Sequence, residues 1–161
     1  RTPADQHGST PSPRNLPPPG ATGLIPPDLI PDEPDEWLAA SDAHGLARTF
    51  LVSPSSPDAR LAMTVAHCRG FVYAASTMGV TGTRSTVGDA AEALVARARE
   101  AAPELAVCVG LGVSNGHQAK EVAAFADGVI VGSAYVREML EGRGADGVRA
   151  LSEDLAGGVR T

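Results

Sequence analysis

Residues 70–84 of the chain read GFVYAASTMGVTGTR, and this stretch decides which fold the sequence favours. It begins as an uninterrupted apolar run, which is typical of a strand buried in a parallel sheet. It then breaks into Gly79-Val-Thr-Gly82, where glycine lets the backbone turn sharply or approach a bound molecule closely. The stretch therefore predicts a buried strand that delivers a glycine-rich loop to one edge of a sheet.

The same pattern recurs along the chain, and helical segments separate the apolar runs. The other predicted strands are GLIPPDLI at 23–30, RTFLVSP at 48–54, LAVCVGLGV at 105–113 and DGVIVGS at 127–133. The predicted helices cover residues 31–45, 57–67, 87–101, 115–126, 134–140 and 147–159. Strands and helices that alternate in this way predict an α/β fold whose parallel sheet is buried on both faces.

Residue types at the helix ends support these boundaries. Ser56 is predicted to cap the second helix, with Pro57 at its first position. Asn115 and Gln118 have the spacing of a capping box at the start of the fourth helix. The third helix has apolar residues at helical spacing, which predicts a buried stripe of Ala91, Leu94, Val95 and Ala98.

Composition limits the classes of function. The chain has 161 residues, enough for one domain, and a net charge of -6, which argues against nucleic acid or an anionic membrane as partner. Cys68 and Cys108 have no metal-site spacing, and we interpret them as free thiols in a reducing cytoplasm, with Cys108 in the core. No apolar run approaches the ~20 residues of a membrane helix, and no signal peptide is recognisable.

Residues 1–20 differ in composition from the rest of the chain. They contain six prolines and one large aliphatic side chain, that of Leu16. Such a segment buries too little surface to offset the entropy lost on ordering, so we expect a disordered leader that is foreign to the fold. A proline-rich docking motif is the alternative interpretation, although a PxxP motif with flanking specificity residues is not evident.

Two architectures contain such a sheet, an open dinucleotide-binding fold and a (β/α)8 barrel. The dinucleotide fingerprint G-x-G-x-x-G is not met by GLGVSNG at 110–116, and no acidic residue ends the next strand. Instead, glycine loops at 79–82, 110–112 and 132–133 follow three successive strands and are predicted to share one edge of the sheet. The last of them precedes a short helix, an arrangement that binds phosphate in many barrels.

These motifs resemble a known family. GFVYAASTMGVTG, VGLGVSN and ADGVIVGSA are similar to the ends of strands six, seven and eight of tryptophan synthase α subunits, in their actinobacterial form. PDLIPDE resembles the fourth strand end, so the resemblance covers residues 21–161. It implies a TIM barrel that cleaves indole-3-glycerol phosphate to indole and glyceraldehyde 3-phosphate. It also implies an αββα complex with a β subunit, which carries the pyridoxal phosphate; no cofactor or metal is expected in this chain.

The resemblance implies roles for individual residues. Backbone amides at four positions are expected to hold the substrate phosphate, namely Gly82, Gly112, Gly132 and Ser133. Tyr73 and Leu111 are expected to line the pocket for the rest of the substrate, and Thr81 to act in loop closure. Asp28 matches an acidic residue at the fourth strand end, where a positioning or subunit-coupling role is expected.

The sequence departs from the family at its catalytic residues. The family's acid/base glutamate and catalytic aspartate precede the fourth strand, and no matching residues are found here. Asp127 precedes the last strand and is expected at the opposite edge of the sheet. Five βα units cannot close an eight-stranded barrel. We therefore expect strands four to eight of a barrel, inactive by themselves, with open edges at the first and last strands.

The sequence leaves two other functions open. One is a different phosphate-binding barrel enzyme, which would need a catalytic lysine or metal ligands at the strand ends. Lys120 is the only lysine and lies in a predicted helix, so this class is weakly supported. The other is a pseudo-subunit that binds a phosphate ester or the β subunit without turnover.

Overall fold

The computed structural model describes residues 20, 22–27, 35–76, 84–110 and 112–160. The predictions for Asp28, Thr81, Gly82 and Leu111 lie outside these residues, as does nearly all of the leader at 1–20. In the part of the chain that the structure describes, no helix is both long and apolar enough to span a bilayer.

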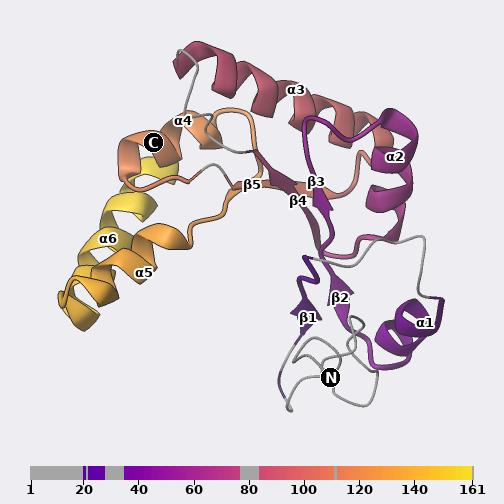
Figure 1. Cartoon of the computed structure of the whole chain (residues 1–161), viewed down its shortest axis with the longest axis horizontal. Coiled ribbons are helices and arrows are strands. Elements are labelled where there is room, and N and C mark those ends of the chain that lie inside the picture. The colour runs from indigo at the N-terminus through magenta and orange to yellow at the C-terminus, as the bar shows by residue number, and fades with distance from the viewer. Residues whose placement is uncertain (1–19, 21, 28–34, 77–83, 111, 161) are drawn as a thin grey trace, which may run out of the picture.

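Strands and helices alternate along most of the chain (Figure 1). In chain order they are β1 (Gly23–Leu24), α1 (Asp35–Ala43), β2 (Ala47–Arg48), β3 (Leu51–Val52), α2 (Asp58–His67), β4 (Phe71–Ala75), α3 (Arg84–Ala101), β5 (Ala106–Gly110), α4 (Gly116–Ala123), β6 (Gly128–Val129), α5 (Ser133–Leu140) and α6 (Gly144–Val159). The predicted strand at 23–30 is confirmed only for β1, and α3 begins three residues earlier than predicted.

All the strands are parallel, and their order in space follows their order in the chain. One sheet has the order β3-β4-β5-β6, and β1 pairs with β2. Thr49 donates to the Leu24 carbonyl, and Tyr73 donates to the Phe50 carbonyl. Residues 47–52 therefore lie between β1 and β4 as one extended segment, so the single strand predicted at 48–54 is recovered as β2 and β3. A sequential order without reversal is that of a barrel wall and not of a dinucleotide-binding sheet.

The helices cover one side of this sheet. In Figure 1 the molecule forms an arch, with α2 and α3 on its convex side, α1 at one end, and α5 and α6 at the other. One-sided cover by helices is what the outer layer of a (β/α)8 barrel provides. The architecture confirms the predicted α/β class and the interpretation as part of a barrel.

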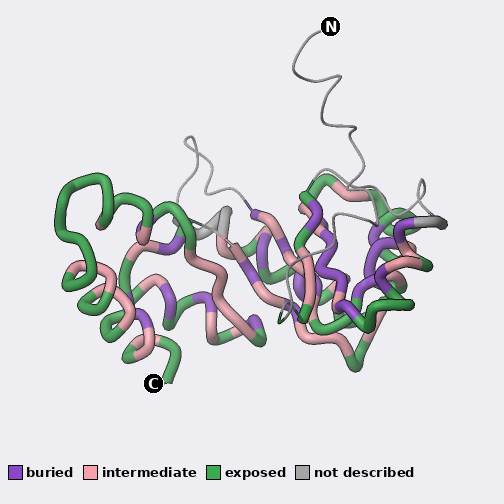
Figure 2. The backbone as a smooth tube through the Cα atoms, turned by 90° about the horizontal axis from the view of Figure 1, so that it is seen from below, coloured by how far each residue is buried: buried purple, intermediate pink, exposed green. Residues whose placement is uncertain are grey.

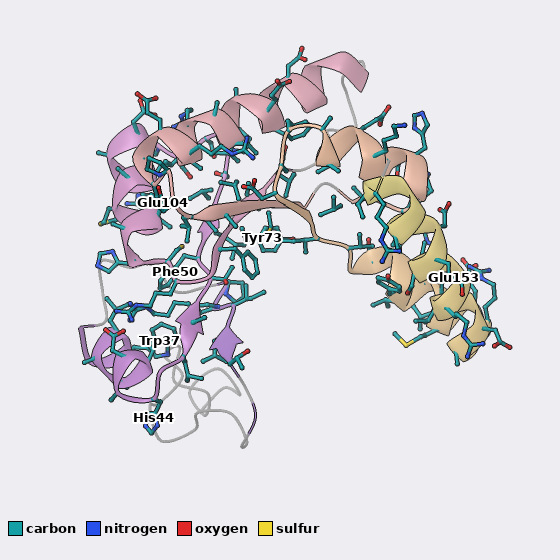
Figure 3. All side chains as sticks on the ribbon, turned by 180° about the vertical axis from the view of Figure 1, so that it is seen from behind. Trp37, His44, Phe50, Tyr73, Glu104 and Glu153 are labelled. Atoms are coloured by element: carbon teal, nitrogen blue, oxygen red, sulfur yellow. The ribbon has the colours of Figure 1, made fainter. Side chains whose placement is uncertain are left out.

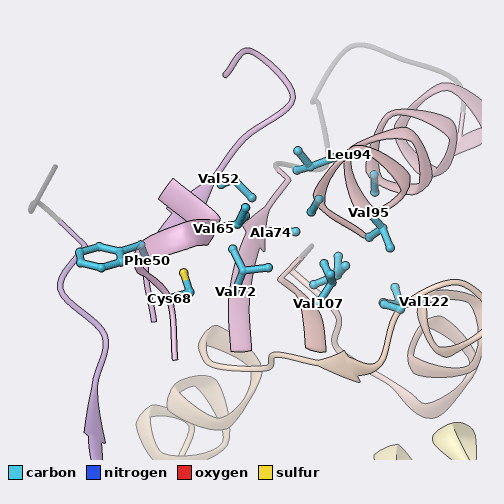
Figure 4. Packing of buried hydrophobic residues seen from close by; sticks show 14 of the residues in the cluster. Phe50, Val52, Val65, Cys68, Val72, Ala74, Leu94, Val95, Val107 and Val122 are labelled. Atoms are coloured by element: carbon cyan, nitrogen blue, oxygen red, sulfur yellow. The ribbon is translucent and has the colours of Figure 1, made fainter. Parts of the chain in front are cut away.

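The core lies between the sheet and these helices (Figure 4). Val72 and Ala74 of β4 and Val107 and Val109 of β5 are fully buried. The predicted stripe on α3 is confirmed, since its four members are 0–1% exposed, namely Ala91, Leu94, Val95 and Ala98. Figure 2 shows the buried positions concentrated in the strands and on the helix faces that contact them. Apolar burial of this kind contributes about 25 cal/mol per Å².

The prediction that the sheet is buried on both faces is wrong, because its other face is only half-buried. Side chains alternate along β4 and β5 between buried and half-buried, so that Phe71, Tyr73 and Ala75 share the half-buried face. Cys108 lies on this face too and is half-buried, which corrects its assignment to the core. The reason is that the described helices cover only the outer face. We call this half-buried surface the inner face of the sheet.

Two predicted helix starts also need correction. Ser56 does not cap α2, because its hydroxyl accepts from the Ser53 amide and Pro57 occupies the cap position. The capping box on α4 is half confirmed: Asn115 Oδ1 accepts from the Gln118 amide at 2.9 Å. The Gln118 side chain reaches one residue further back and accepts from the amide and hydroxyl of Ser114.

A buried arginine fixes α1 to the sheet. Arg48 is 5% exposed, and its guanidinium donates to the carbonyls of Leu38 and His67 and to Ser41 Oγ. It also pairs with Asp42 at 3.0 Å. These bonds satisfy the buried charge and connect the ends of α1 and α2 to the strand between them.

Candidate functional site at the carboxyl edge of the sheet

The carboxyl ends of β4, β5 and β6 lie next to one another, because the three strands are parallel and adjacent. The Ser76 amide donates to the Gly110 carbonyl at 3.1 Å, and the Ile130 amide donates to the Val109 carbonyl at 2.8 Å. Val109 pairs with Val129 in the register of β5 and β6. Gly112 and Gly132 each come three residues after a member of this pair. The two glycines therefore follow neighbouring strands at equal distance along the chain.

Tyr73 lies on the inner face and points along the sheet toward this edge (Figure 3). Its ring passes over Gly110, where an added Cβ would collide with the phenol hydroxyl and ring carbons. Tyr73 and Gly110 are two positions apart in the register, so the ring crosses from β4 to β5. Glycine at position 110 is therefore what allows Tyr73 to lie beside the carboxyl edge, where it was predicted to contact substrate.

Gly112 begins the loop after β5 in a conformation that favours glycine. Its φ is +69°, in the left-handed region, and a Cβ at this position would meet nothing within 4 Å. The residue is exposed, so its backbone faces open space. This geometry fits the predicted role of a backbone amide that a ligand can approach.

The start of α5 is the second feature at this edge. Gly132 is its N-cap residue and Ser133 its first residue, and no side chain caps this end among the described residues. Gly132 and Ser133 are exposed, and a Cβ at Gly132 would meet nothing within 4 Å. The first N–H groups of a helix have no partner within the helix, and its dipole favours an anion there. The first turn of α5 is thus open to an anionic group.

The start of α4 differs, because protein groups already satisfy it. Asn115 caps the Gln118 amide, and Gln118 holds Ser114, as described above. The Gly116 amide donates to Asp154 Oδ2 of α6 at 2.6 Å. A carboxylate therefore occupies the position that an anion would take at this helix. Of the two helix starts that follow β5 and β6, that of α5 is the one with space for phosphate.

The opposite edge of the sheet holds Asp127, as predicted. Its carboxylate accepts from the Val107 amide and from Arg99, each at 2.8 Å. The hydrogen bond from the Val107 amide, with a smaller contribution from Arg99, lowers the pKa of this carboxyl. Burial, and then the charge of Asp127, raise the pKa of the Cys108 thiol, which favours its neutral form. Asp127 thus has a structural role at the amino end of β5.

Other candidate sites are not evident in the described part of the chain. Its residues contain no group of three or more His, Cys, Asp and Glu side chains that would hold a metal ion. A groove between α2 and α3 lies on the outer face, and a second one lies beside Asp127. Arg97 and Asp58 form an ion pair within the first groove.

The sequential parallel strands, the helices on one side and the glycine-rich carboxyl edge define this protein as part of a (β/α)8 barrel of the TIM type. The chain belongs to the tryptophan synthase alpha chain family, whose model matches residues 14–156. The tryptophan synthase alpha chain of Mycobacteroides abscessus is 61% identical over 147 residues, which are 91% of this chain and 55% of that protein. That of Salinispora arenicola is 59% identical over 163 residues, 99% of this chain and 61% of the relative.

Solved structures agree with this assignment. A tryptophan synthase structure from M. tuberculosis, in an aminoacrylate-bound form, matches with a TM-score of 0.80 and 48% identity over 99% of this chain and 59% of that chain. Tryptophan synthase subunit alpha from Campylobacter jejuni matches with a TM-score of 0.75 and 30% identity, over 83% of this chain and 53% of that one. The chain therefore spans between half and two-thirds of the length of these relatives.

The described residues that the sequence predicts for the site lie at or beside the carboxyl edge, and their binding roles stay predictions. Gly112 follows β5, Gly132 and Ser133 follow β6, and Tyr73 lies within β4 with its hydroxyl over Gly110. Asp154 was missed, since a contact between residues 38 positions apart leaves no local pattern. The role of Gly110 could not be predicted either, because the sequence does not show that the Tyr73 ring crosses over it.

Proposed function

We propose that this chain binds indole-3-glycerol phosphate as part of the reaction of tryptophan synthase α subunits, in which indole and glyceraldehyde 3-phosphate are released. Membership of the family supports the substrate class. One structural observation supports the site: the open first turn of α5 and the exposed left-handed Gly112 follow adjacent parallel strands at equal offsets. Backbone amides at such positions bind phosphate without a positive side chain.

In this proposal the phosphate is held by Gly112, Gly132 and Ser133, together with Gly82. Tyr73 and Leu111 contact the remainder of the substrate, and Thr81 acts in loop closure. The direction of Tyr73 on the inner face supports its role, because its hydroxyl reaches the level of Gly110 at the carboxyl edge. A phosphate beyond this edge places the ring end of the substrate over the inner face.

For the chain by itself we propose binding without cleavage. Cleavage needs groups that deliver a proton to the indole ring and remove one from the substrate. Among the described inner-face residues of β4 and β5, the groups other than hydrocarbon or glycine are the Tyr73 phenol and the Cys108 thiol. The described inner-face residues of these two strands include no carboxylate or imidazole, and burial raises the pKa of the Cys108 thiol, which favours its neutral form.

We further propose the partner and the compartment that the family implies. The partner is a tryptophan synthase β subunit, which carries pyridoxal phosphate and receives indole. The two free cysteines support a reducing compartment such as the cytoplasm. A pseudo-subunit differs from this proposal only in lacking turnover when the β subunit is present.

An indole-release assay on the purified 161-residue chain, with and without a β subunit, tests the proposal when it is paired with calorimetric titration by indole-3-glycerol phosphate. We expect saturable binding by the chain alone and no indole. Indole formed only with the β subunit would support a functional subunit, whereas none in either case would favour the pseudo-subunit. Absence of binding would contradict the proposed site, and turnover by the chain alone would contradict its inactivity.

A further inference from the structure

Helix α6 contacts the first residue of α4 through a carboxylate and two glycines. Asp154 Oδ2 accepts from the Gly116 amide at 2.6 Å. A Cβ at Gly158, one turn further along α6, would collide with the Gly116 carbonyl oxygen, and a Cβ at Gly116 would collide with the Asp154 carbonyl oxygen. The absence of side chains at both glycines therefore lets the backbones of α4 and α6 meet closely enough for the carboxylate to reach its amide.

The same helix also contacts α5. Tyr135 Oη lies 3.1 Å from Ser152 Oγ, and Ser152 donates to the Val148 carbonyl within α6. Successive residues of an α-helix are ~100° apart, so Ser152 and Asp154 point to different sides of α6. Helix α6 is thus held against α4 by one side and against α5 by another, and Figure 1 shows the three helices together at one end of the arch.

Both contacts lie close to the proposed phosphate site. Gly116 is four residues after Gly112, with the hydrogen-bonded Ser114 and Asn115 between them. Tyr135 is in the first turn of α5, two residues after Ser133. Helix α6 itself contributes no residue to the carboxyl edge, but it connects the two segments that do.

We propose that Asp154 is a positioning residue for the phosphate site, which it serves by fixing the loop at residues 112–116 relative to the start of α5. This inference rests on the proposed function, since it assumes that phosphate binds between these segments. Asp154 does not touch the ligand. It holds the Gly116 amide, and through it the preceding loop, in the position that presents Gly112 to the phosphate.

The direction in which the affinity for phosphate changes when the Asp154 carboxylate is removed distinguishes a positioning role from a simple charge effect. Asp154 is an exposed carboxylate close to an anion site, so by Coulomb's law its removal would strengthen the binding of phosphate. A positioning role predicts the opposite, because the loop loses its fixed geometry when Gly116 loses its acceptor. The direction of the change in affinity therefore separates the two.

The experiment is a calorimetric titration of the full chain and its variants with glycerol 3-phosphate. We expect Asp154→Ala to weaken binding by about fivefold, the effect of losing one charge-assisted hydrogen bond that orders a loop. Asp154→Asn keeps an acceptor oxygen and is expected to recover most of the affinity. The matched control is Glu153→Ala, which removes the same charge from the neighbouring exposed position and is expected to leave binding unchanged or slightly stronger.

Two further readouts keep the test decisive. The amide resonance of Gly116 in ¹⁵N–¹H spectra reports directly whether the hydrogen bond is lost in Asp154→Ala, and thermal unfolding reports whether the variant folds. Unchanged or stronger binding by a folded Asp154→Ala chain would overturn the positioning role while leaving the proposed function intact. A wild-type chain that does not bind glycerol 3-phosphate would overturn the proposed function, and this inference with it.

Discussion

The proposed function depends on a few residues at the carboxyl edge of the sheet. Among them, the geometry defines the role of Gly110 most sharply. Its missing side chain leaves room for Tyr73, which lies across β5 because of it. Position 110 therefore controls where the tyrosine ring lies, although it has no functional group of its own.

We predict that Gly110→Ala displaces Tyr73 and destabilises the fold by about 1–3 kcal/mol, as overpacking does. Tyr73→Ala in the same chain is expected to relieve the collision, so that the two changes are not additive in a double-mutant cycle. Urea unfolding of the four chains measures this coupling. The control is Gly88→Ala in α3, where a Cβ meets nothing within 4 Å; it is expected to stabilise by about 0.5–1 kcal/mol. Fully additive effects at positions 73 and 110 would contradict the crossing.

Asp127 gives a second prediction at this scale, on pH. Its pKa is lowered in the folded chain, mainly by the Val107 amide. A carboxyl with a lowered pKa contributes stability above its unfolded pKa of about 4, and this contribution is lost as the pH falls toward the folded value. Asp127→Asn is therefore expected to lower stability at pH 7 and to flatten the loss of stability below about pH 4, measured by thermal unfolding from pH 2 to 7. An acid limb that is equally steep in both chains would contradict this role.

Some of the residues at the site could be predicted from the sequence, and some of their contacts could not. Gly112 and Gly132 were predicted because glycine after a parallel strand is a local signal, whereas Tyr73 was predicted only through the resemblance to the family; the binding roles of all three stay predictions. The bond from Asp154 to Gly116 could not be predicted, because its geometry depends on how α6 crosses α4. Ser56 was assigned a cap because the residue type fits, yet its hydroxyl has a nearer partner in the Ser53 amide.

At the scale of elements, the contrast between the starts of α4 and α5 is the observation with the widest consequences. Protein groups satisfy the first turn of α4, whereas no described side chain caps that of α5.

Strands and helices were all predicted in the right order, since apolar runs and helical periodicity are independent of long-range contacts. The lengths of the strands were overestimated, because a strand ends where its pairing with a neighbouring strand stops, and the sequence does not show where that is.

We predict that Asn115→Ala destabilises the chain by about 1 kcal/mol, because the first turn of α4 loses the cap on the Gln118 amide. Asn115→Asp keeps an acceptor oxygen and is expected to retain most of the stability. Chemical unfolding measured by circular dichroism gives the two differences. No such loss is expected for Ser133→Ala, because Ser133 does not cap α5. Equal losses for Asn115→Ala and Ser133→Ala would contradict the distinction between the two helix starts.

At the scale of the whole molecule, the inner face of the sheet is the main departure from what the sequence predicts. Continuous apolar strands predicted burial on both sides, and the described helices cover only one. Strands that are apolar on both faces are typical of a closed barrel, in which side chains from other strands pack against the second face. The parallel direction of the strands, by contrast, was predicted correctly from the alternation of strands and helices, and the barrel was favoured over an open dinucleotide-binding sheet by the glycine loops.

The exposure of this face can be tested through the two cysteines. Cys108 lies half-buried on the inner face, and Cys68 is buried in the core beside Arg48. We predict that a thiol reagent modifies Cys108 first in the native chain, and that Cys108→Ser removes this fast phase. Burial raises the pKa of the Cys108 thiol, so the rate is expected to keep rising with pH beyond about 8.5, where an ordinary thiol is half ionised. A native chain in which Cys68 reacts first would contradict an accessible inner face.

The proposed function depends on phosphate binding at the carboxyl edge of the sheet, through the open start of α5 and the loop at Gly112. The most direct measurement is a titration of the ¹⁵N-labelled chain with glycerol 3-phosphate, followed by ¹⁵N–¹H correlation spectra. We expect saturable shifts of the amides of Gly112, Gly132 and Ser133, and unchanged amides beside Asp127 at the opposite edge. Shifts confined to other positions, or none up to millimolar ligand, would contradict it.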